Sequence, residues 1–151
     1  MGLDMFIWGK QRLWGISDES KEIQSNVSAM FPELGNAKVN VVEAEFAYWR
    51  KANAIHNWFV KNVQDGEDDC KEAYLEKVNL EKLLYVINEV LEDHSKAEKL
   101  LPSTNGFYFG STDYDSRYFN DLEYTKETIS KIVDKWDTDY KNWNFYYQSS
   151  W

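Results

Sequence analysis

The stretch VNVVEAEFAYWRKANAIHNWFV, residues 39–60, decides the fold, because two different hydrophobic periods meet in it. In residues 39–46, β-branched and acidic residues alternate, so that Glu43 and Glu45 share one side and Val42, Ala44 and Phe46 share the other. This period of two is typical of a strand. From residue 48 onward the apolar residues return at the 3.6-residue period of a helix core face; they are Tyr48, Ala52, Ile55, Phe59 and Val63. We therefore predict a strand that runs directly into a helix.

Working outward, residues 2–9 (GLDMFIWG) predict an interior strand and residues 143–151 a chain-closing one. A second helix is expected from Asn79 to about Asp93, and a third over residues 118–136. Residues 73–78 and 107–109 read as short strands, and residues 11–38 as a long connection with a short helix. The expected fold class is α+β, with two layers in which three main helices pack on a largely antiparallel or mixed sheet.

Length and composition favour one domain over residues 1–151. Of the 151 residues 43% are hydrophobic and 17% aromatic, which is enough for one core but not for two. The single cysteine, Cys70, cannot form an internal disulfide, and no apolar run approaches the roughly 20 residues of a membrane span. No leader signal is present. We expect a cytoplasmic protein with no membrane contact.

The net charge of −9 disfavours direct binding to nucleic acid, because phosphates and acidic side chains repel each other. The same charge allows the opposite relation, in which acidic side chains imitate a phosphate backbone and occupy a nucleic-acid-binding protein. A simpler explanation is solubility, since acidic surfaces are common.

The helix expected from residue 48 carries the main candidate ligand face, which comprises Trp49, Arg50, Asn53, His56 and Asn57. A guanidinium fork, two amides and flanking rings are what a nucleotide or another planar anion requires: donors for phosphate, hydrogen bonds for a base edge, and a stacking surface. The structural alternative is that Arg50 pairs with Glu45, that Asn53 caps a neighbouring loop, and that His56 is a core-edge histidine.

The segment GSTDYD, residues 110–115, is a turn before the third helix, and its Ser111, Thr112 and Tyr114 extend the candidate ligand face. Asp113 and Asp115 are better explained as helix caps than as the start of a Mg²⁺ or Ca²⁺ site. With Glu43 or Glu45 they would make a carboxylate-metal-dependent enzyme, which we keep as an alternative. No hydrolytic triad, P-loop, GxGxxG or zinc motif is present, so we expect no cofactor and favour a non-catalytic protein.

The aromatic tail WNFYYQSSW, residues 143–151, has more rings than a closing strand needs. Trp143, Phe145 and Tyr147 suit the core, while Tyr146 and Trp151 are candidates for an interface, because large apolar patches are uncommon on monomers. We expect a homodimer.

Four stretches, MGLDMF, YWRKANAIHNWFV, GFYFGSTDYD and YYQSSW, resemble a family of small uncharacterised proteins of bacteriophages and prophages. The resemblance covers nearly the whole length and is weakest over residues 11–38. It implies a phage or prophage setting and an accessory, anti-defence role in the host cytoplasm, and it implies no activity and no site residues. With the Arg50 face, it predicts a non-catalytic protein that binds a small anionic or nucleotide-like ligand or a host protein.

Overall fold

The computed structural model describes residues 2–15 and 17–151. Four antiparallel strands form one open sheet in the order β2-β1-β4-β3. The strands are β1 (Asp4–Arg12), β2 (Val41–Arg50), β3 (Ala73–Leu75) and β4 (Asn144–Ser150). The α-helices of the described residues are α1 (Asp18–Met30), α2 (Asn53–Asn62), α3 (Lys77–Glu92), α4 (Ala97–Leu100) and α5 (Ser116–Asp134), with short 3₁₀ helices η1 (Pro32–Leu34) and η2 (His94–Lys96). The predicted α+β class and the antiparallel sheet are confirmed; the described helices number five rather than three main ones.

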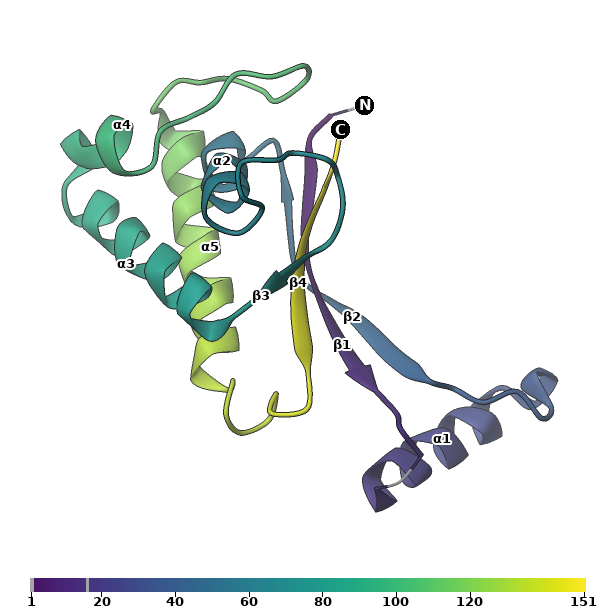
Figure 1. Cartoon of the computed structure of the whole chain (residues 1–151). Helices are drawn as coiled ribbons and strands as arrows, with labels where there is room; N and C mark the ends of the chain where they lie inside the picture. The colour runs from purple at the N-terminus through teal and green to yellow at the C-terminus, as the bar shows by residue number, and fades with distance from the viewer. Residues whose placement is uncertain (1, 16) are drawn as a thin grey trace.

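The core lies where α2, α3 and α5 face one side of the sheet (Figure 1). Alternate residues of β1 and β4 point into it, which is why Met5, Ile7 and Tyr147 have no exposed surface. Phe59 of α2 stacks on Tyr147 with their ring centroids 4.0 Å apart. These contacts join the first strand, the last strand and α2 into one apolar centre.

The boundary between β2 and α2 differs from the prediction of a helix that starts at Tyr48. Tyr48, Trp49 and Arg50 belong to β2, where they pair with Phe6, Met5 and Asp4 of β1, and the helix begins at Asn53. Lys51, with a left-handed φ of 61°, turns the chain between them, and its N–H donates to Leu3 O at 2.7 Å. The ladder of backbone hydrogen bonds to β1 satisfies these residues as a strand, so tertiary pairing overrides the local helical period.

A bulge in the β1–β2 ladder turns Phe46 into the core. The register shifts between Ile7 and Trp8, so that Ala47 faces Ile7 and Glu45 faces Trp8, with Phe46 as the extra residue. Its ring packs against Phe145 at 4.9 Å between centroids. A Cβ added to Gly9 would lie 2.3 Å from the Phe46 ring. Glycine is therefore required at this position of β1, because any side chain would occupy the space of that ring.

Two further predictions need correction. Residues 107–109 form a turn rather than a strand, held by the Phe109 N–H, which donates to Gly106 O at 3.2 Å. The predicted strand 73–78 ends at Leu75, and the next helix begins at Lys77 rather than at Asn79. Asn79 contributes to its start nonetheless, since its side chain accepts from the Glu76 N–H at 2.8 Å.

Residues 11–38 contain the expected short helix, and they build an arm. Beyond Lys10, β1 has β2 as its only neighbour in the sheet, and the two strands run on away from the helices to α1 at the far end (Figure 1). We call the described residues 11–15 and 17–41 the arm, and the rest of the described chain the body. Among the described helices, none combines the length and the hydropathy needed to span a bilayer.

Candidate functional site

The candidate site is a cavity of about 350 Å³ between α2, the loop before β3, the loop before α5 and the chain end. We call it the His56 pocket; it is lined by His56, Asn57, Val60, Asp68, Thr104, Asn105, Gly106, Phe107, Phe109 and Trp151. Aromatic rings with a few convergent polar groups around a concave space of this size are typical of small-molecule sites.

His56 anchors the pocket floor. Its Nε2 lies 2.9 Å from Asp68 Oδ2, and its Nδ1 lies 2.8 Å from the Tyr147 hydroxyl. Burial lowers the pKa of His56 below its usual 6.5, and the nearby Asp68 offsets this only in part. The imidazole is therefore neutral at pH 7. Since a carboxylate only accepts, Nε2–H donates to Asp68, and Nδ1 accepts from Tyr147.

Asp68 also fixes the chain end beside the pocket. Its Oδ1 accepts from Trp151 Nε1 at 3.1 Å and from Ser149 Oγ at 3.3 Å. The indole of Trp151 then meets Phe109 in an edge-on arrangement, with ring centroids 6.3 Å apart. One carboxylate thus holds both the histidine of α2 and the aromatic C-terminus, so the polar floor and the aromatic wall depend on each other.

Asn53 and Asn57, predicted to contact a ligand, hold the other wall in place. The Asn53 amide donates to Phe109 O at 3.1 Å and to Ser111 O at 2.8 Å, and its oxygen accepts from Thr104 N at 3.1 Å. Asn53 is buried, and these bonds occupy all but one of its hydrogen-bonding sites. Asn57 donates to Pro102 O at 3.1 Å and also lines the pocket. The structure therefore gives Asn53 the loop-capping role considered as its alternative.

Arg50 and Lys51 lie together next to the loop that forms this wall. A Cβ added to Gly2 would lie 3.2 Å from Lys51 Cε, 3.9 Å from Arg50 Nε and 3.8 Å from Tyr108 O. Arg50 is 58% exposed, and its Nε is 4.0 Å from Asp4 Oδ1, so its partner is Asp4 rather than the expected Glu45. An exposed arginine and a partly buried lysine consequently lie close to the residue 106–110 loop.

The other predicted ligand residues lie elsewhere. Trp49 is buried and donates from Nε1 to Thr125 Oγ1 at 2.8 Å, which makes it a core residue. Ser111 and Thr112 are exposed, and each accepts a hydrogen bond within its own loop, Ser111 Oγ from Asp113 N and Thr112 O from Ser103 Oγ. Tyr114 accepts weakly from Ser103 N at 3.4 Å. None of these four lines the His56 pocket.

A second hollow lies where α2 and α5 begin, and it contains Lys51, Asn53, Ser111 and Asp121. Burial raises the pKa of Asp121 to about 6, against the opposing effect of Arg117. The cavity measures about 20 Å³, which leaves room for about one water molecule, so it does not hold a nucleotide.

Of the two weak metal candidates, Asp115 takes the predicted capping role, whereas Asp113 contributes only its backbone N–H, which donates to Ser111 Oγ at 3.0 Å. Asp115 caps α5 by accepting from Arg117 N and Tyr118 N at 3.0 and 3.2 Å. Glu43, the suggested third ligand, lies on β2 and pairs with Lys10 at 3.2 Å. Among residues 2–15 and 17–151, no three His, Cys, Asp or Glu side chains are grouped so that they hold a metal ion. The metal-dependent enzyme has no structural support in this region.

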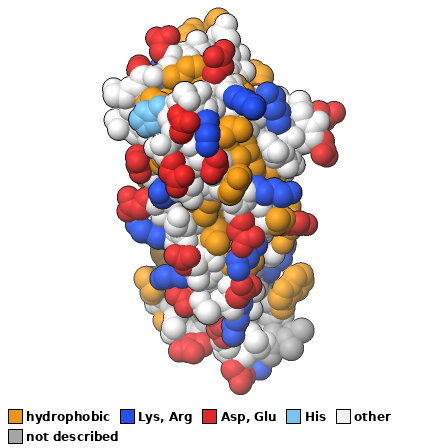
Figure 2. Space-filling view, turned by 90° about the vertical axis from the view of Figure 1, so that its left-hand side faces the viewer, with side chains coloured by type: hydrophobic (Ala, Val, Ile, Leu, Met, Phe, Trp, Pro, Cys, Tyr) orange, Lys and Arg blue, Asp and Glu red, His pale blue; other side chains and the backbone are white. Residues whose placement is uncertain are grey.

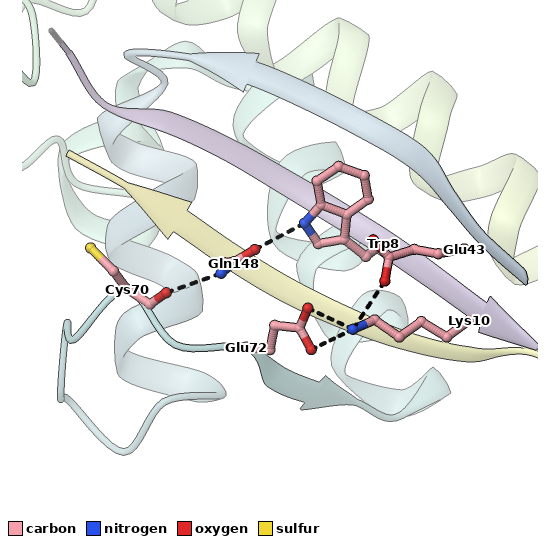
Figure 3. Close-up of polar contacts among 6 residues, drawn as sticks. All are labelled: Trp8, Lys10, Glu43, Cys70, Glu72 and Gln148. Carbon is pink, nitrogen blue, oxygen red and sulfur yellow. Dashed lines mark hydrogen bonds and ion pairs between the residues drawn. The ribbon is translucent and has the colours of Figure 1, made fainter. Parts of the chain in front are cut away.

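The sheet face turned away from the helices carries two separate sets of polar contacts (Figure 3). Lys10 reaches between Glu43 and Glu72, with its Nζ 3.2 and 2.7 Å from their carboxylates. Trp8 Nε1 donates to Gln148 Oε1 at 3.1 Å, and Gln148 Nε2 donates to the Cys70 carbonyl at 3.3 Å. None of these residues lines the His56 pocket, so this face is a separate surface.

Sequence reasoning did not select the residues that complete the pocket, which are Asp68, Thr104, Asn105, Phe107, Phe109 and Trp151. Two local features of the sequence include residues of this set: the acidic turn QDGEDDC, residues 64–70, and the aromatic tail, residues 143–151. Neither feature indicates that the segments meet, because they are separated by up to 83 residues along the chain. In comparisons with known proteins, no family model, curated protein or solved structure matches this chain, so its functional assignment depends on the geometry of the His56 pocket.

Proposed function

We propose that this protein is a non-catalytic phage accessory protein that binds a small, nucleotide-like anion, with the planar group in the His56 pocket and the anionic group toward Arg50 and Lys51. The observation that carries this proposal is that one loop, residues 104–110, lies against both an aromatic, amide-lined cavity and a pair of cations, the exposed Arg50 and the partly buried Lys51.

The aromatic residues suit a flat ligand. Phe107 is 77% exposed and Trp151 is 56% exposed, although both line the cavity. Base–aromatic stacking contributes about 1 to 3 kcal/mol per base, and the amides of Asn57 and Asn105 offer hydrogen bonds for a base edge. Ligand binding would cover rings that otherwise face water.

The cations suit a phosphate or a carboxylate. A guanidinium binds such groups in a two-pronged fashion, and Arg50 is restrained only by its 4.0 Å approach to Asp4. Lys51 and Tyr108 both adopt left-handed backbone conformations, with φ of 61° and 64°. Strained residues persist where surrounding structure holds them, and they cluster at ligand sites.

The hydrogen bonding of His56 argues for binding rather than catalysis. Both ring nitrogens have partners within the chain, and the ring is 1% exposed. Burial raises the pKa of Tyr147 well above 10, so its hydroxyl keeps its proton. An imidazole held in this way has no free nitrogen to exchange a proton with a substrate.

Thermal-shift screening against nucleoside monophosphates, cyclic nucleotides and ADP-ribose tests the proposal. A true ligand at 100 times its Kd adds about 2.7 kcal/mol of stability. Phe107→Ala and Arg50→Ala should each weaken binding at least tenfold, and neither should change the melting temperature of the free protein, because both side chains are largely exposed.

Arg12→Ala is the matched control for Arg50→Ala, since Arg12 is an exposed arginine at the opposite end of the β1–β2 pair. Lys51→Gly adds a second test, because glycine keeps the left-handed backbone while the substitution removes the whole side chain with its ammonium group. If no compound raises the melting temperature, or if Arg12→Ala weakens binding as much as Arg50→Ala, the proposal is wrong.

A second candidate is a host protein with a basic surface, occupied by acidic side chains of the outer sheet face. Exposed Glu43 and Glu45 lie two residues apart on β2, which favours this candidate. On the helix side, the face shown in Figure 2, acidic and basic side chains are interspersed, so that side offers no acidic surface for such a partner. Capture of a host protein that weakens steeply with salt, and that is lost in Glu43→Gln/Glu45→Gln, would support the decoy.

A further inference from the structure

The arm carries a cluster of large apolar side chains that the chain itself does not cover. Trp14 is 75% exposed and Met30 73%, while Phe31, Val41 and Leu34 are 47%, 42% and 36% exposed. Scattered apolar residues on a surface are normal, but five at the end of one projecting hairpin form a patch.

Helix α1 extends this patch with an apolar stripe. Ile23, Val27 and Met30 recur at spacings of four and three, so they lie on one face of the helix. Ile23 and Val27 are only partly buried, and neither belongs to the hydrophobic core. The one buried residue of α1 is Ser20.

An amphipathic helix of this length requires a partner for its apolar face. Ser17 caps α1 by accepting from Ser20 N at 3.1 Å, and Asp18 and Glu19 favour its N-terminal dipole. Caps of this kind contribute about 1 kcal/mol, whereas isolated helices of about 13 residues are marginal in water. In proteins most helical stability comes from packing of the apolar face, and in this chain α1 is packed only in part: Ser20 and the neighbouring Leu13 are buried, whereas Ile23 and Val27 stay partly exposed and Met30 is exposed.

Charge and area identify the partner. The arm carries four acidic residues, Asp18, Glu19, Glu22 and Glu33, and three basic ones, Arg12, Lys21 and Lys38, so it has no excess of positive charge to attract nucleic acid or an anionic membrane. With about 150 to 250 Å² for a fully exposed large side chain, covering the five residues removes on the order of 500 Å² per copy. Two identical arms therefore bury roughly 1,000 Å², the lower bound of a specific interface.

We propose that the arm is a self-association surface, on which the α1 stripe and the neighbouring apolar residues pack against the same residues of a second copy about a two-fold axis. A two-fold axis across α1 makes the two helices antiparallel, which also opposes their dipoles. This surface is separate from the His56 pocket, so either proposal can fail while the other stands.

Light scattering of the full-length protein on a sizing column measures the association. The wild type should elute at 2 × 17.9 kDa, about 36 kDa, and dissociate on dilution. Val27→Glu/Met30→Glu should weaken dimerisation at least a hundredfold and elute at 17.9 kDa with an unchanged circular dichroism spectrum. Tyr85→Glu, which changes a 67% exposed aromatic residue on α3, is the matched control and should leave the dimer intact.

A disulfide experiment locates the contact. In a Cys70→Ser background, which removes the one native cysteine, Val27→Cys should cross-link two copies under mild oxidation, whereas Tyr85→Cys should not. The proposal is overturned if the wild-type protein is still monomeric at 100 times the protein concentration used for the thermal-shift screen. It is also overturned by a dimer that survives Val27→Glu/Met30→Glu, or by a monomer that floats with uncharged lipid vesicles through the same residues.

Discussion

Helices α3 and α1 both carry an apolar stripe, yet only α3 buries its stripe within the chain. Leu80, Leu83, Ile87 and Val90 of α3 have no exposed surface. In α1 the corresponding residues are partly or largely exposed, and Met30 is 73% exposed. The difference shows that an apolar helical pattern predicts which face of a helix is stabilised by burial, but does not predict whether residues of the same chain cover that face.

The largest expected effect separates the two helices directly. Ile87→Ala removes fully buried methyl groups from α3 and should lower the free energy of unfolding by about 2 to 5 kcal/mol, because it leaves a cavity that the core fills only partly. Urea denaturation measures this loss. A cost below about 1 kcal/mol would mean that α3 is packed no better than α1.

The next prediction concerns the last position at which the β1–β2 pair packs against the body. Gly9→Ala should destabilise the protein by about 2 to 3 kcal/mol, since the new methyl group would lie 2.3 Å from the Phe46 ring. In a Phe46→Ala background, Gly9→Ala should cause almost no loss in the free energy of unfolding. A double-mutant cycle measures this difference. Equal costs in both backgrounds would contradict the close packing of Phe46 on Gly9.

A smaller effect follows from the buried histidine of the body, which has no counterpart on the arm. The pKa of His56 is lower in the folded chain than in the unfolded chain. Below about pH 6.5 the unfolded chain therefore binds a proton at this histidine more readily than the folded chain does. Stability should therefore fall as the pH drops below 6.5, by at most about 1.4 kcal/mol per pH unit. Above pH 6.5 His56 contributes nothing to the pH dependence of the free energy of unfolding.

Asp121 acts in the opposite direction and needs its own control. Its folded pKa, raised to about 6, makes the folded chain bind a proton more readily than the unfolded chain between about pH 4 and 6, so its contribution to stability falls as the pH rises. Denaturation at several pH values in an Asp121→Asn background isolates the His56 slope. A flat profile between pH 5.5 and 6.5 in that background would contradict the buried, neutral His56.

The smallest effect is expected on the arm. Val27→Ala should lower the free energy of unfolding of the monomer by less than about 1 kcal/mol, because the side chain is only partly buried and lies outside the hydrophobic core. Denaturation at low protein concentration, where a dimer is dissociated, measures it. A loss as large as that of Ile87→Ala would show that α1 is packed against the body after all.

The apolar periods predicted much of this fold. The stripe on α3 and the alternation in β1 and β4 follow from local spacing, because each element has one face that must be buried. The start of α2 was wrong by five residues, since Tyr48, Trp49 and Arg50 fit a helical period and a strand equally well. Pairing with Asp4–Phe6 decided for the strand, and that partner lies 44 residues earlier in the chain.

The candidate site was predictable only in part. His56 and Asn57 were selected because a histidine and an amide share one helix face with other polar residues, and both line the pocket. Asn53 was selected on the same grounds, but its amide is occupied by the backbone of residues 104–111. A side chain's type shows which bonds it is able to make, whereas only its neighbours show whether those bonds are already made.

The sequence by itself determined the α+β class, the net charge of −9 and the apolar stripe of α3, because composition and hydrophobic period depend only on the residues themselves and their near neighbours in the chain. The tertiary structure alone decided that Asp68 joins His56 to Trp151, that Arg50 and Lys51 lie beside the residue 106–110 loop, and that α1 stands apart on an arm. These contacts join segments far apart in the chain, and the folding of the whole domain brings them together.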